Sequence, residues 1–373
     1  MPRSQGRRLF LACAVSAAAV LGCGRPSVTV GFVGPLTGSS SAIGIGCRNG
    51  FLMALGSGPA AAPGHIPRLR LLVKDDRNDA QRCLEVFNEL KAEGCSIIVL
   101  GTPSQTAGLA LPWAMDNGVL VISPTVSTPV PGSSNALFIR VNMSSMEYGI
   151  ALAHVAHDRY GANHVGIVGD SRNASYVDAV ERAFVAEYAR LGCRPAFDRR
   201  FDSTKDSPYA DLVAAIRSTH ADGLLAVAAS TEVVLMAKEL EREGERTRLF
   251  LPPWPLTLDL IQNGGKAVEG VIAVSIADLE YRTAEGQAFE QDYRREYGEE
   301  PSFTAMFGYE AASILRAALA SSASWLPKAL RDRVIAIREF SGLQGPIRFD
   351  ADGKAQRTLF LFTIDHGAFK RLD

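Results

Sequence analysis

The sequence lacks the motifs of common enzyme classes and the charge of a nucleic-acid-binding protein. It contains no G-x-S-x-G, H-E-x-x-H or P-loop motif, so hydrolase and NTPase functions have no support. Its net charge is -1, and no cluster of lysines and arginines occurs in the body of the chain, so we expect no binding to nucleic acid. The apolar run Leu224–Ala237 contains Thr231 and Glu232 and is too short to cross a bilayer.

The usual patterns of dinucleotide and metal sites are also missing. Asp75 and Asp76 follow a predicted strand, but the glycines of the preceding turn are not spaced as G-x-G-x-x-G, and Pro35 stands in that turn. His154 and His157 lie one helical turn apart, but no nearby acid–histidine pair completes a metal site. We therefore expect no cofactor, no metal and no catalytic residue, and the protein is not expected to be an enzyme.

The N-terminal residues are predicted to be a signal rather than part of the fold. Three arginines precede the apolar run Leu9–Leu21, which is too short and wrongly flanked for a membrane span. The run leads into Cys23 and resembles a bacterial lipobox, in which this cysteine carries lipid; a plain signal peptide is the alternative. We expect a lipoprotein signal peptide over residues 1–22 and an exported, membrane-anchored protein in the periplasm or at the outer face of the cell membrane.

Cysteine is scarce, with six residues in the chain. Cys13 leaves with the predicted signal, and the cysteines of the body have no C-x-x-C spacing. Export permits a disulfide, but we expect mostly buried thiols, and the sequence leaves any connectivity open. The cysteines of the body are Cys47, Cys83, Cys95 and Cys193.

The sequence is rich in alternating strands and helices. The pattern runs from Val28–Val33 to Val119–Ser123 and begins again near His164–Gly169. Such alternation is typical of parallel sheets with right-handed crossovers. The predicted fold class is α/β, with two doubly wound parallel-sheet lobes and a cleft between them that suits a small ligand.

Helices left over after the second lobe indicate that the chain crosses between the lobes more than once. Hinge crossings are expected at Arg140–Asn142, Ser275–Asp278 and Gly342–Gly345. The first lobe is assigned residues 27–141 and 278–342, and the second lobe residues 142–277 and 343–373. In the last segment, Gly345–Gly353 and Thr358–Ile364 are predicted to form a hairpin closed by an Asp-Gly turn.

Small hydroxyl residues follow two neighbouring predicted strands, Ser96–Leu100 and Val119–Ser123. Both loops leave the carboxyl edge of the sheet, where open sheets bind ligands. Hydroxyls and free backbone N–H groups suit a carboxylate or another small acceptor-rich group, although the same residues could simply cap helices. They are Thr102, Ser104 and Thr106 after the first strand, and Thr125, Ser127 and Thr128 after the second.

A set of short motifs, in this order along the chain, resembles the type I periplasmic binding proteins. The resemblance is to their leucine/isoleucine/valine-binding branch, which serves branched-chain amino-acid ABC transporters, and it runs from about Val28 to Asp373. The motifs are Val33–Gly38, Arg48–Gly50, Asp75–Asp79, Ile122–Pro124, Tyr297–Ser302 and Gly345–Gly353.

The resemblance implies two lobes joined by three crossings, which close on a ligand. It places the groups that hold the α-carboxylate and α-amino groups of an amino acid at Ser104, Thr125 and Ser127, with Thr125 acting through its carbonyl. The second lobe usually adds a tyrosine after its first strand, for which Tyr176 is the candidate.

Several positions depart from the family pattern. Ile43 replaces an aromatic residue, and Ala229 and Ser230 fall in a segment where the family has Gly-Gly-Tyr-Tyr, with Ser230 the ligand-binding candidate there. Pro253 stands where an acid often pairs with the ligand ammonium, beside Trp254, which could contact an aromatic or aliphatic ligand. Ordinary branched-chain amino-acid binding is therefore in question, unless Asp278 or Glu232 supplies the missing acid.

Together these observations predict a lipid-anchored solute-binding receptor of an ABC importer. Its expected partners are a small carboxylate-bearing ligand (amino-acid-like, or an aromatic or aliphatic acid), the ABC permease subunits and the membrane. A ligand sensor that passes cleft closure to a regulatory partner is the alternative, and the sequence does not separate the two.

Overall fold

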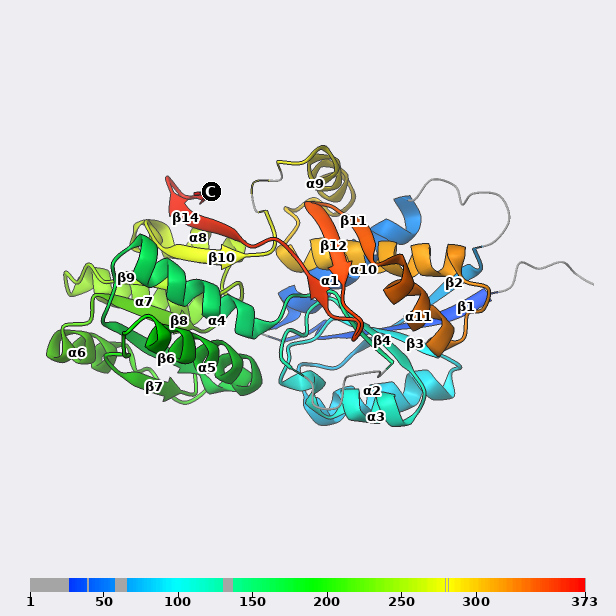
Figure 1. The fold of residues 1–373 in the computed structure, drawn as a ribbon, viewed down its shortest axis with the longest axis horizontal. Coiled ribbons are helices and arrows are strands. Elements are labelled where there is room, and N and C mark those ends of the chain that lie inside the picture. The colour runs from blue at the N-terminus through cyan, green and yellow to red at the C-terminus, as the bar shows by residue number, and fades with distance from the viewer. Residues whose placement is uncertain are drawn as a thin grey trace, which may run out of the picture.

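The computed structural model describes residues 27–38, 40–57, 66–129, 137–278, 280 and 282–372. The predicted signal peptide and Cys23 lie outside these residues. Figure 1 shows two lobes beside each other, each built on its own sheet. We call the lobe that contains β1 (Ser27–Gly34) the first lobe and the lobe that contains β6 (Val165–Asp170) the second lobe.

The sheet of the first lobe has the strand order β2-β1-β3-β4-β5, and all pairs of neighbouring strands are parallel. Its central strands are fully buried runs, as expected for strands covered by helices on both faces. The elements are β1 (Ser27–Gly34), α1 (Ser41–Ser57), β2 (Arg68–Asp75), α2 (Ala80–Ala92), β3 (Ile97–Leu100), the short helix Thr106–Gly108, α3 (Ala110–Asp116), β4 (Leu120–Ser123) and β5 (Phe138–Arg140).

The sheet of the second lobe has the order β15-β14-β10-β9-β8-β6-β7. Strands β6 to β10 pair in parallel, whereas β14 is antiparallel to both of its neighbours. The elements are α4 (Ser145–His154), the π-helical turn Val155–Arg159, β6 (Val165–Asp170), the turn Ser171–Asn173, α5 (Ala174–Arg190), β7 (Asp198–Phe201), α6 (Tyr209–Thr219), β8 (Gly223–Val227), α7 (Ser230–Arg242), β9 (Arg248–Leu251), α8 (Leu258–Gly264), the turn Gly265–Val268, β10 (Ile272–Ser275), β14 (Phe360–Asp365) and β15 (Ala368–Arg371).

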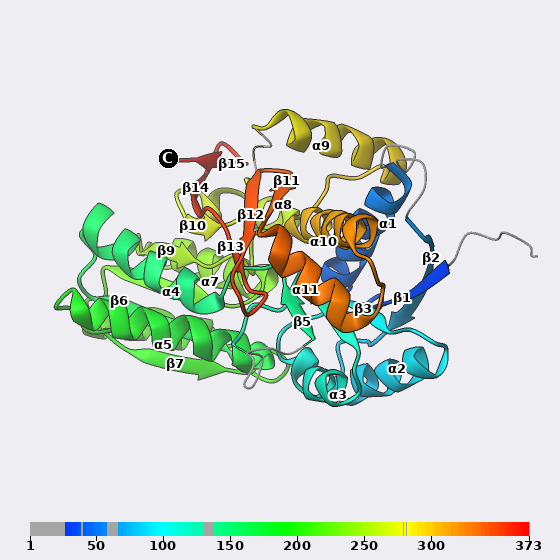
Figure 2. The same cartoon turned by 45° about the vertical axis from the view of Figure 1, so that its right-hand side comes forward.

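The chain returns to the first lobe after β10, and its longest helix there packs against α1 (Figure 2). These later elements are α9 (Ala284–Tyr297), α10 (Phe303–Ser321), α11 (Pro327–Ile337), β11 (Glu339–Gly342), β12 (Gly345–Phe349) and β13 (Ala355–Gln356). Helices α1 and α10 approach so closely that their backbones touch at glycines. A Cβ added to Gly308 would lie 2.0 Å from the carbonyl oxygen of Cys47, and one added to Gly50 would lie 1.8 Å from that of Ala305.

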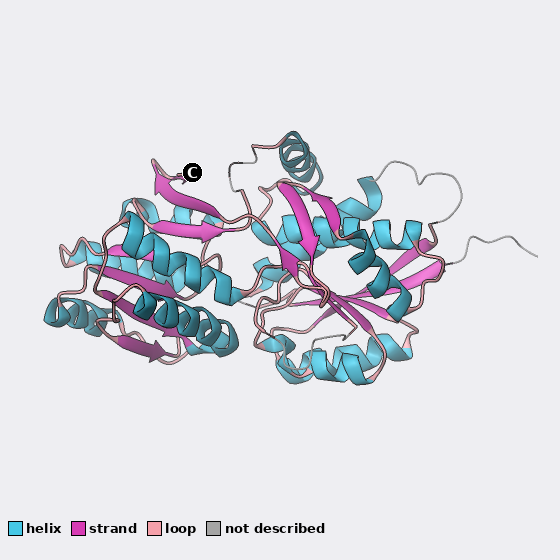
Figure 3. Ribbon diagram, in the orientation of Figure 1, coloured by secondary structure: helices cyan, strands magenta, loops and turns pink. Residues whose placement is uncertain are grey.

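The end of the chain differs from the expected hairpin. Strand β12 pairs with β11 and β13 in a separate small sheet, while β14 pairs with β10 in the second lobe (Figure 3). Ile347, Phe349 and Ala355 are buried in the core of the first lobe, so residues 345–356 belong there and not to the second lobe. The final passage therefore follows Gln356 instead of Gly342–Gly345. Two short apolar stretches beside an Asp-Gly turn have the same sequence pattern whether they pair with each other or with other strands.

The prediction for the cysteines is confirmed, and the helix after β2 begins at a side-chain cap. Asp79 caps α2 by accepting the Arg82 N–H at 2.6 Å. The cysteines of the body are buried free thiols, and burial raises the pKa of the Cys95 thiol to about 11. Among the described residues, no helix has both the length and the apolar character needed to cross a membrane.

Candidate ligand-binding cleft

The two hydroxyl-bearing loops meet at the carboxyl edge of the first sheet, where the sequence places them. The Ser127 N–H donates to Ser104 Oγ at 3.2 Å. The Thr125 hydroxyl donates to the carbonyls of Thr102 at 2.8 Å and Leu100 at 3.2 Å. These bonds join the loops after β3 and β4, and they use the Thr125 hydroxyl within the protein. Its contribution to a ligand would therefore come from its carbonyl.

The first crossing between the lobes is tied directly to the same loop. Asn142 Nδ2 donates to the Thr125 carbonyl at 3.1 Å, and the Tyr148 hydroxyl of α4 donates to Asn142 Oδ1 at 2.8 Å. The backbone N–H and the hydroxyl of Ser145 both donate to the Ser127 carbonyl, at 2.9 and 3.2 Å. The crossing thus holds the loop after β4 and the start of the second lobe in one hydrogen-bonded unit.

Tyr176 and Trp254 form an aromatic wall in the second lobe. Their rings meet edge to face, with centroids 5.8 Å apart. Tyr176 is 6% exposed, and among the described residues its hydroxyl has no hydrogen-bond partner of normal geometry. Burial raises the pKa of Tyr176 well above its ordinary value, with the Trp254 backbone N–H as a weaker opposing influence. The hydroxyl therefore stays protonated, and it is a buried donor without an acceptor.

A small cavity is lined by residues of both lobes, and its described lining carries no charged side chain. Its volume is about 50 Å³. That exceeds the roughly 10–15 Å³ that one water needs, but it is far below the roughly 300–1,000 Å³ of drug-sized sites. The lining residues are Ile43, Pro103, Ser104, Thr125, Ser127, Asn142, Tyr148, Asn173, Tyr176, Pro253, Trp254, Phe303, Thr304 and Phe307.

Gln105 joins the lobes beside this cavity. Its backbone N–H donates to Asn173 Oδ1 of the second lobe at 3.2 Å. Its side-chain Oε1 accepts the backbone N–H of Ser175 at 3.1 Å and the Ser175 hydroxyl at 2.7 Å. Asn173 does not cap α5 with its own side chain, so a residue of the first lobe satisfies the N-terminus of a helix in the second. In this structure the cleft is closed by these contacts.

Most of the predicted site residues meet in the cavity. Ser104, Thr125, Ser127, Tyr176 and Trp254 all line it. So do Ile43 and Pro253, two positions that depart from the family pattern.

Ser230 is the exception. It is the first residue of α7 and is not among the described residues that line the cavity. In the second lobe, the residues that follow β6 and β9 form the wall instead, including Asn173 and Trp254.

Neither acid considered as a replacement for Pro253 reaches the cavity. Glu232 accepts from Arg172 Nη2 at 2.9 Å, and Asp278 lies 3.3 Å from Arg371 Nη1. Both carboxylates are buried, and both are paired within the protein. Among the described residues, neither lines the cavity.

Sequence reasoning missed several lining residues. Ser302 caps α10 by accepting the Ala305 N–H, and the first residues of that helix, Phe303 and Thr304, line the cavity. Phe303 and Phe307 share one face of the helix at i, i+4 spacing, and this pattern was visible in the sequence. Their position at the cleft was not visible, because it depends on how α10 packs on α1. The missed residues are Pro103, Asn142, Tyr148, Asn173, Phe303, Thr304 and Phe307.

Comparison with known proteins agrees with this architecture. A model of the periplasmic binding protein family matches residues 27–368. The chain is a periplasmic binding protein. Its fold is the type I form of that family, with leucine-binding proteins among its structural neighbours.

This binding protein is distantly similar to characterised relatives. It is 23% identical over 287 residues to the leucine-, isoleucine-, valine-, threonine- and alanine-binding protein of Pseudomonas aeruginosa, covering 76% of this chain and 73% of that one. A leucine-binding protein from Thermotoga maritima superimposes with a TM-score of 0.84 at 22% identity, over 93% of this chain and 98% of the other. A solute-binding protein from R. palustris in complex with benzoate superimposes with a TM-score of 0.82 at 19% identity, over 93% and 95%.

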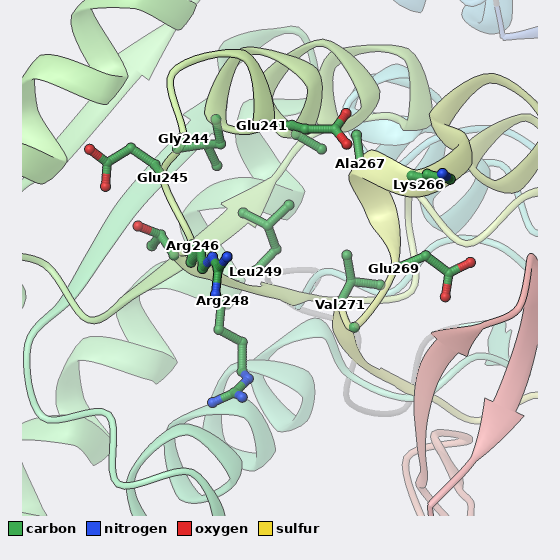
Figure 4. Close-up of a pocket in the computed structure, with 14 residues that line it drawn as sticks. Glu241, Gly244, Glu245, Arg246, Arg248, Leu249, Lys266, Ala267, Glu269 and Val271 are labelled. Carbon is green, nitrogen blue, oxygen red and sulfur yellow. The ribbon is translucent and has the colours of Figure 1, made fainter.

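A larger hollow lies elsewhere on the binding protein, at the edge of the second lobe where β9 begins (Figure 4). Its volume is about 610 Å³, and several of its charged side chains already serve the fold. Glu245 pairs with Arg217, and Glu269 accepts the backbone N–H groups of His366 and Gly367 at 3.0 and 2.7 Å. Open parallel sheets bind ligands at the opposite, carboxyl edge, so the inter-lobe cavity is the candidate site.

Proposed function

We propose that this periplasmic binding protein is the receptor of an ABC importer and that it binds a small carboxylate-bearing solute between its lobes. The observation that carries the proposal is the lining of the cavity. Ser104 and Ser127 line it from the first lobe, and Tyr176, whose buried hydroxyl has no acceptor among the described residues, lines it from the second. Hydrogen-bond donors on both walls suit a ligand with acceptor oxygens. Such a ligand contacts the donors of both lobes only when the lobes are close together.

The receptor would work by binding without chemistry. A solute that contacts both lobes binds the closed arrangement more tightly than the open one, and this difference in affinity drives closure. The Gln105–Ser175 contact adds hydrogen bonds that form only when the lobes meet. The permease of the importer would then recognise the closed, loaded receptor.

The ligand class in this proposal is an amino-acid-like molecule or an aromatic or aliphatic acid. Relatives of similar fold include a leucine-binding protein and a protein in complex with benzoate. Both ligands carry a carboxylate beside an apolar body. The cavity offers a matching pair of surfaces, with hydroxyls on the first lobe and the rings of Tyr176 and Trp254 on the second.

Replacing Ser127 with alanine should weaken ligand binding by about 1–3 kcal/mol, because a hydrogen bond to a charged oxygen is lost. A thermal-shift screen of amino acids, aromatic acids and dicarboxylates identifies a ligand first. Isothermal titration then measures the dissociation constant of wild type and variant. Ser230→Ala is the matched control, since Ser230 does not line the cavity, and its dissociation constant should not change. An unchanged constant in Ser127→Ala would count against the assignment.

We also propose that Cys23 carries the lipid that anchors the receptor at the membrane. Metabolic labelling with palmitate should mark the wild-type protein, and Cys23→Ala should remain unlabelled and leave the membrane fraction. Cys193→Ala is the control for the loss of a cysteine elsewhere in the chain. Cys193 is a buried thiol of the second lobe, so this variant should be labelled with palmitate like wild type. Labelling of Cys23→Ala would show that the lipid is attached elsewhere.

A further inference from the structure

Among the described residues that line the inter-lobe cavity, no side chain would neutralise a bound ammonium. None of its described lining residues is Asp, Glu, Lys, Arg or His. The buried acids of the second lobe near the carboxyl edge are already paired. Asp170 and Glu232 both accept from Arg172, at 3.0 and 2.9 Å, and Ser203 donates to Asp170 at 2.7 Å.

A carbonyl acceptor on the first-lobe wall of the cavity is also in use. The Thr125 carbonyl accepts from Asn142 Nδ2 at 3.1 Å. Among the described lining residues, an ammonium group would meet hydroxyl, amide and carbonyl oxygens, but no carboxylate. Burying a cation without a charged partner is costly.

The electrostatics of the cavity favour an anion instead. Two helices begin at its wall: α5, through Asn173 and Tyr176, and α10, through Phe303 and Thr304. Helix N-termini carry partial positive charge. Tyr176 also lines the cavity, and its buried hydroxyl is a donor without an acceptor among the described residues. Ser104 Oγ already accepts the Ser127 N–H, which leaves its own proton to donate.

The rest of the lining is apolar and largely aromatic. Tyr148, Trp254, Phe303 and Phe307 supply ring surface, and Ile43 adds an aliphatic patch. The cavity volume of about 50 Å³ restricts the ligand to a small molecule. A carboxylate held by hydroxyls and helix N-termini, with its apolar part against these rings, would use every feature of the lining.

We propose that the cleft selects a small monocarboxylic acid with an aromatic or branched apolar body and no α-ammonium group, so that an amino acid is bound less tightly than its desamino counterpart. This inference rests on the proposed receptor function and narrows its ligand class.

Matched ligand pairs test the inference on the unaltered full chain. L-phenylalanine is compared with 3-phenylpropanoate, and L-leucine with 4-methylpentanoate, by isothermal titration and thermal shift. Within each pair the molecules differ only by the replacement of the ammonium with hydrogen. The desamino acid should bind at least about tenfold more tightly. Equal or tighter binding of the amino acid overturns the inference and leaves the receptor function intact. Failure of both members of both pairs to bind counts against the inference and against the carboxylate-binding function together.

Two variants test the reason for the selectivity. Pro253→Asp places a carboxylate on the cavity wall and should reverse the preference within the phenylalanine pair. Tyr176→Phe keeps the ring but removes the hydroxyl donor. It should raise the dissociation constant of 3-phenylpropanoate by about tenfold. A melting temperature near that of wild type confirms that each variant is folded. If folded Pro253→Asp keeps the wild-type preference, the absence of an acid is not what sets the selectivity.

Discussion

Replacing Glu310 with glutamine is expected to lower the free energy of unfolding by about 3–5 kcal/mol, because it leaves the buried Arg357 guanidinium without a charged partner. The side chains are 2% and 4% exposed and form a two-pronged ion pair, with nitrogen–oxygen distances of 2.6 and 2.9 Å. Glu310 Oε1 also accepts the backbone N–H of Leu343 at 3.0 Å.

This ion pair holds together parts of the chain that are far apart in sequence. Glu310 lies on α10, Leu343 lies between β11 and β12, and Arg357 lies in the last passage to the second lobe. The guanidinium also stands 5.4 Å from the ring centre of Phe307, which lines the cavity. We therefore expect Glu310→Gln to weaken ligand binding as well as stability.

Urea denaturation of Glu310→Gln and of two further variants checks this prediction. Glu339→Gln makes the same chemical change in the exposed pair with Arg348 and should alter stability little. The double variant Glu310→Leu with Arg357→Met removes both charges and should recover much of the loss, since no unpaired charge stays buried. Unfolding curves of Glu310→Gln that coincide with wild type would contradict the prediction.

Replacing Gly308 with alanine should cost about 3 kcal/mol of stability, although alanine is the better helix former. The new Cβ would lie 2.0 Å from the carbonyl oxygen of Cys47, a backbone atom that cannot rotate away. Helices α1 and α10 would have to move apart. The first turn of α10 would then move with Phe303 and Thr304, which line the cavity.

The matched control is Gly56→Ala in α1, where an added Cβ meets nothing within 4 Å. That substitution should leave stability unchanged or raise it by up to about 1 kcal/mol through helix propensity. Thermal unfolding monitored by circular dichroism measures both variants. Equal melting temperatures for the two would show that the helices yield easily at Gly308.

The fold class and one wall of the cleft were predictable from the sequence because they depend on local features. Alternating buried strands and amphipathic helices indicate a parallel sheet wherever they occur. The strands β3 and β4 are neighbours in the sheet, so Ser104 and Ser127 had to reach the same edge. Tyr176 and Trp254 follow β6 and β9 in the same way.

The positions of other residues could not be predicted from local sequence features. Residues 345–356 joined the first core and not the second lobe, and Ser230 lies outside the cavity although it begins a helix after a strand of the correct sheet. Both outcomes depend on which surface an element packs against. Hydrophobic patterning reports that a residue is buried, but not what it is buried against.

The amino-acid sequence by itself determined the alternation of elements, the helix cap at Asp79 and the chemistry of the hydroxyl loops. The tertiary structure alone decided that Asn142, Phe303 and Phe307 complete the cavity and that its described wall carries no charge. The physical reason is that a cleft is assembled from contacts between distant segments. Their mutual positions follow from packing, such as the close approach of α1 and α10 at Gly50 and Gly308, which leaves no periodic mark in the sequence.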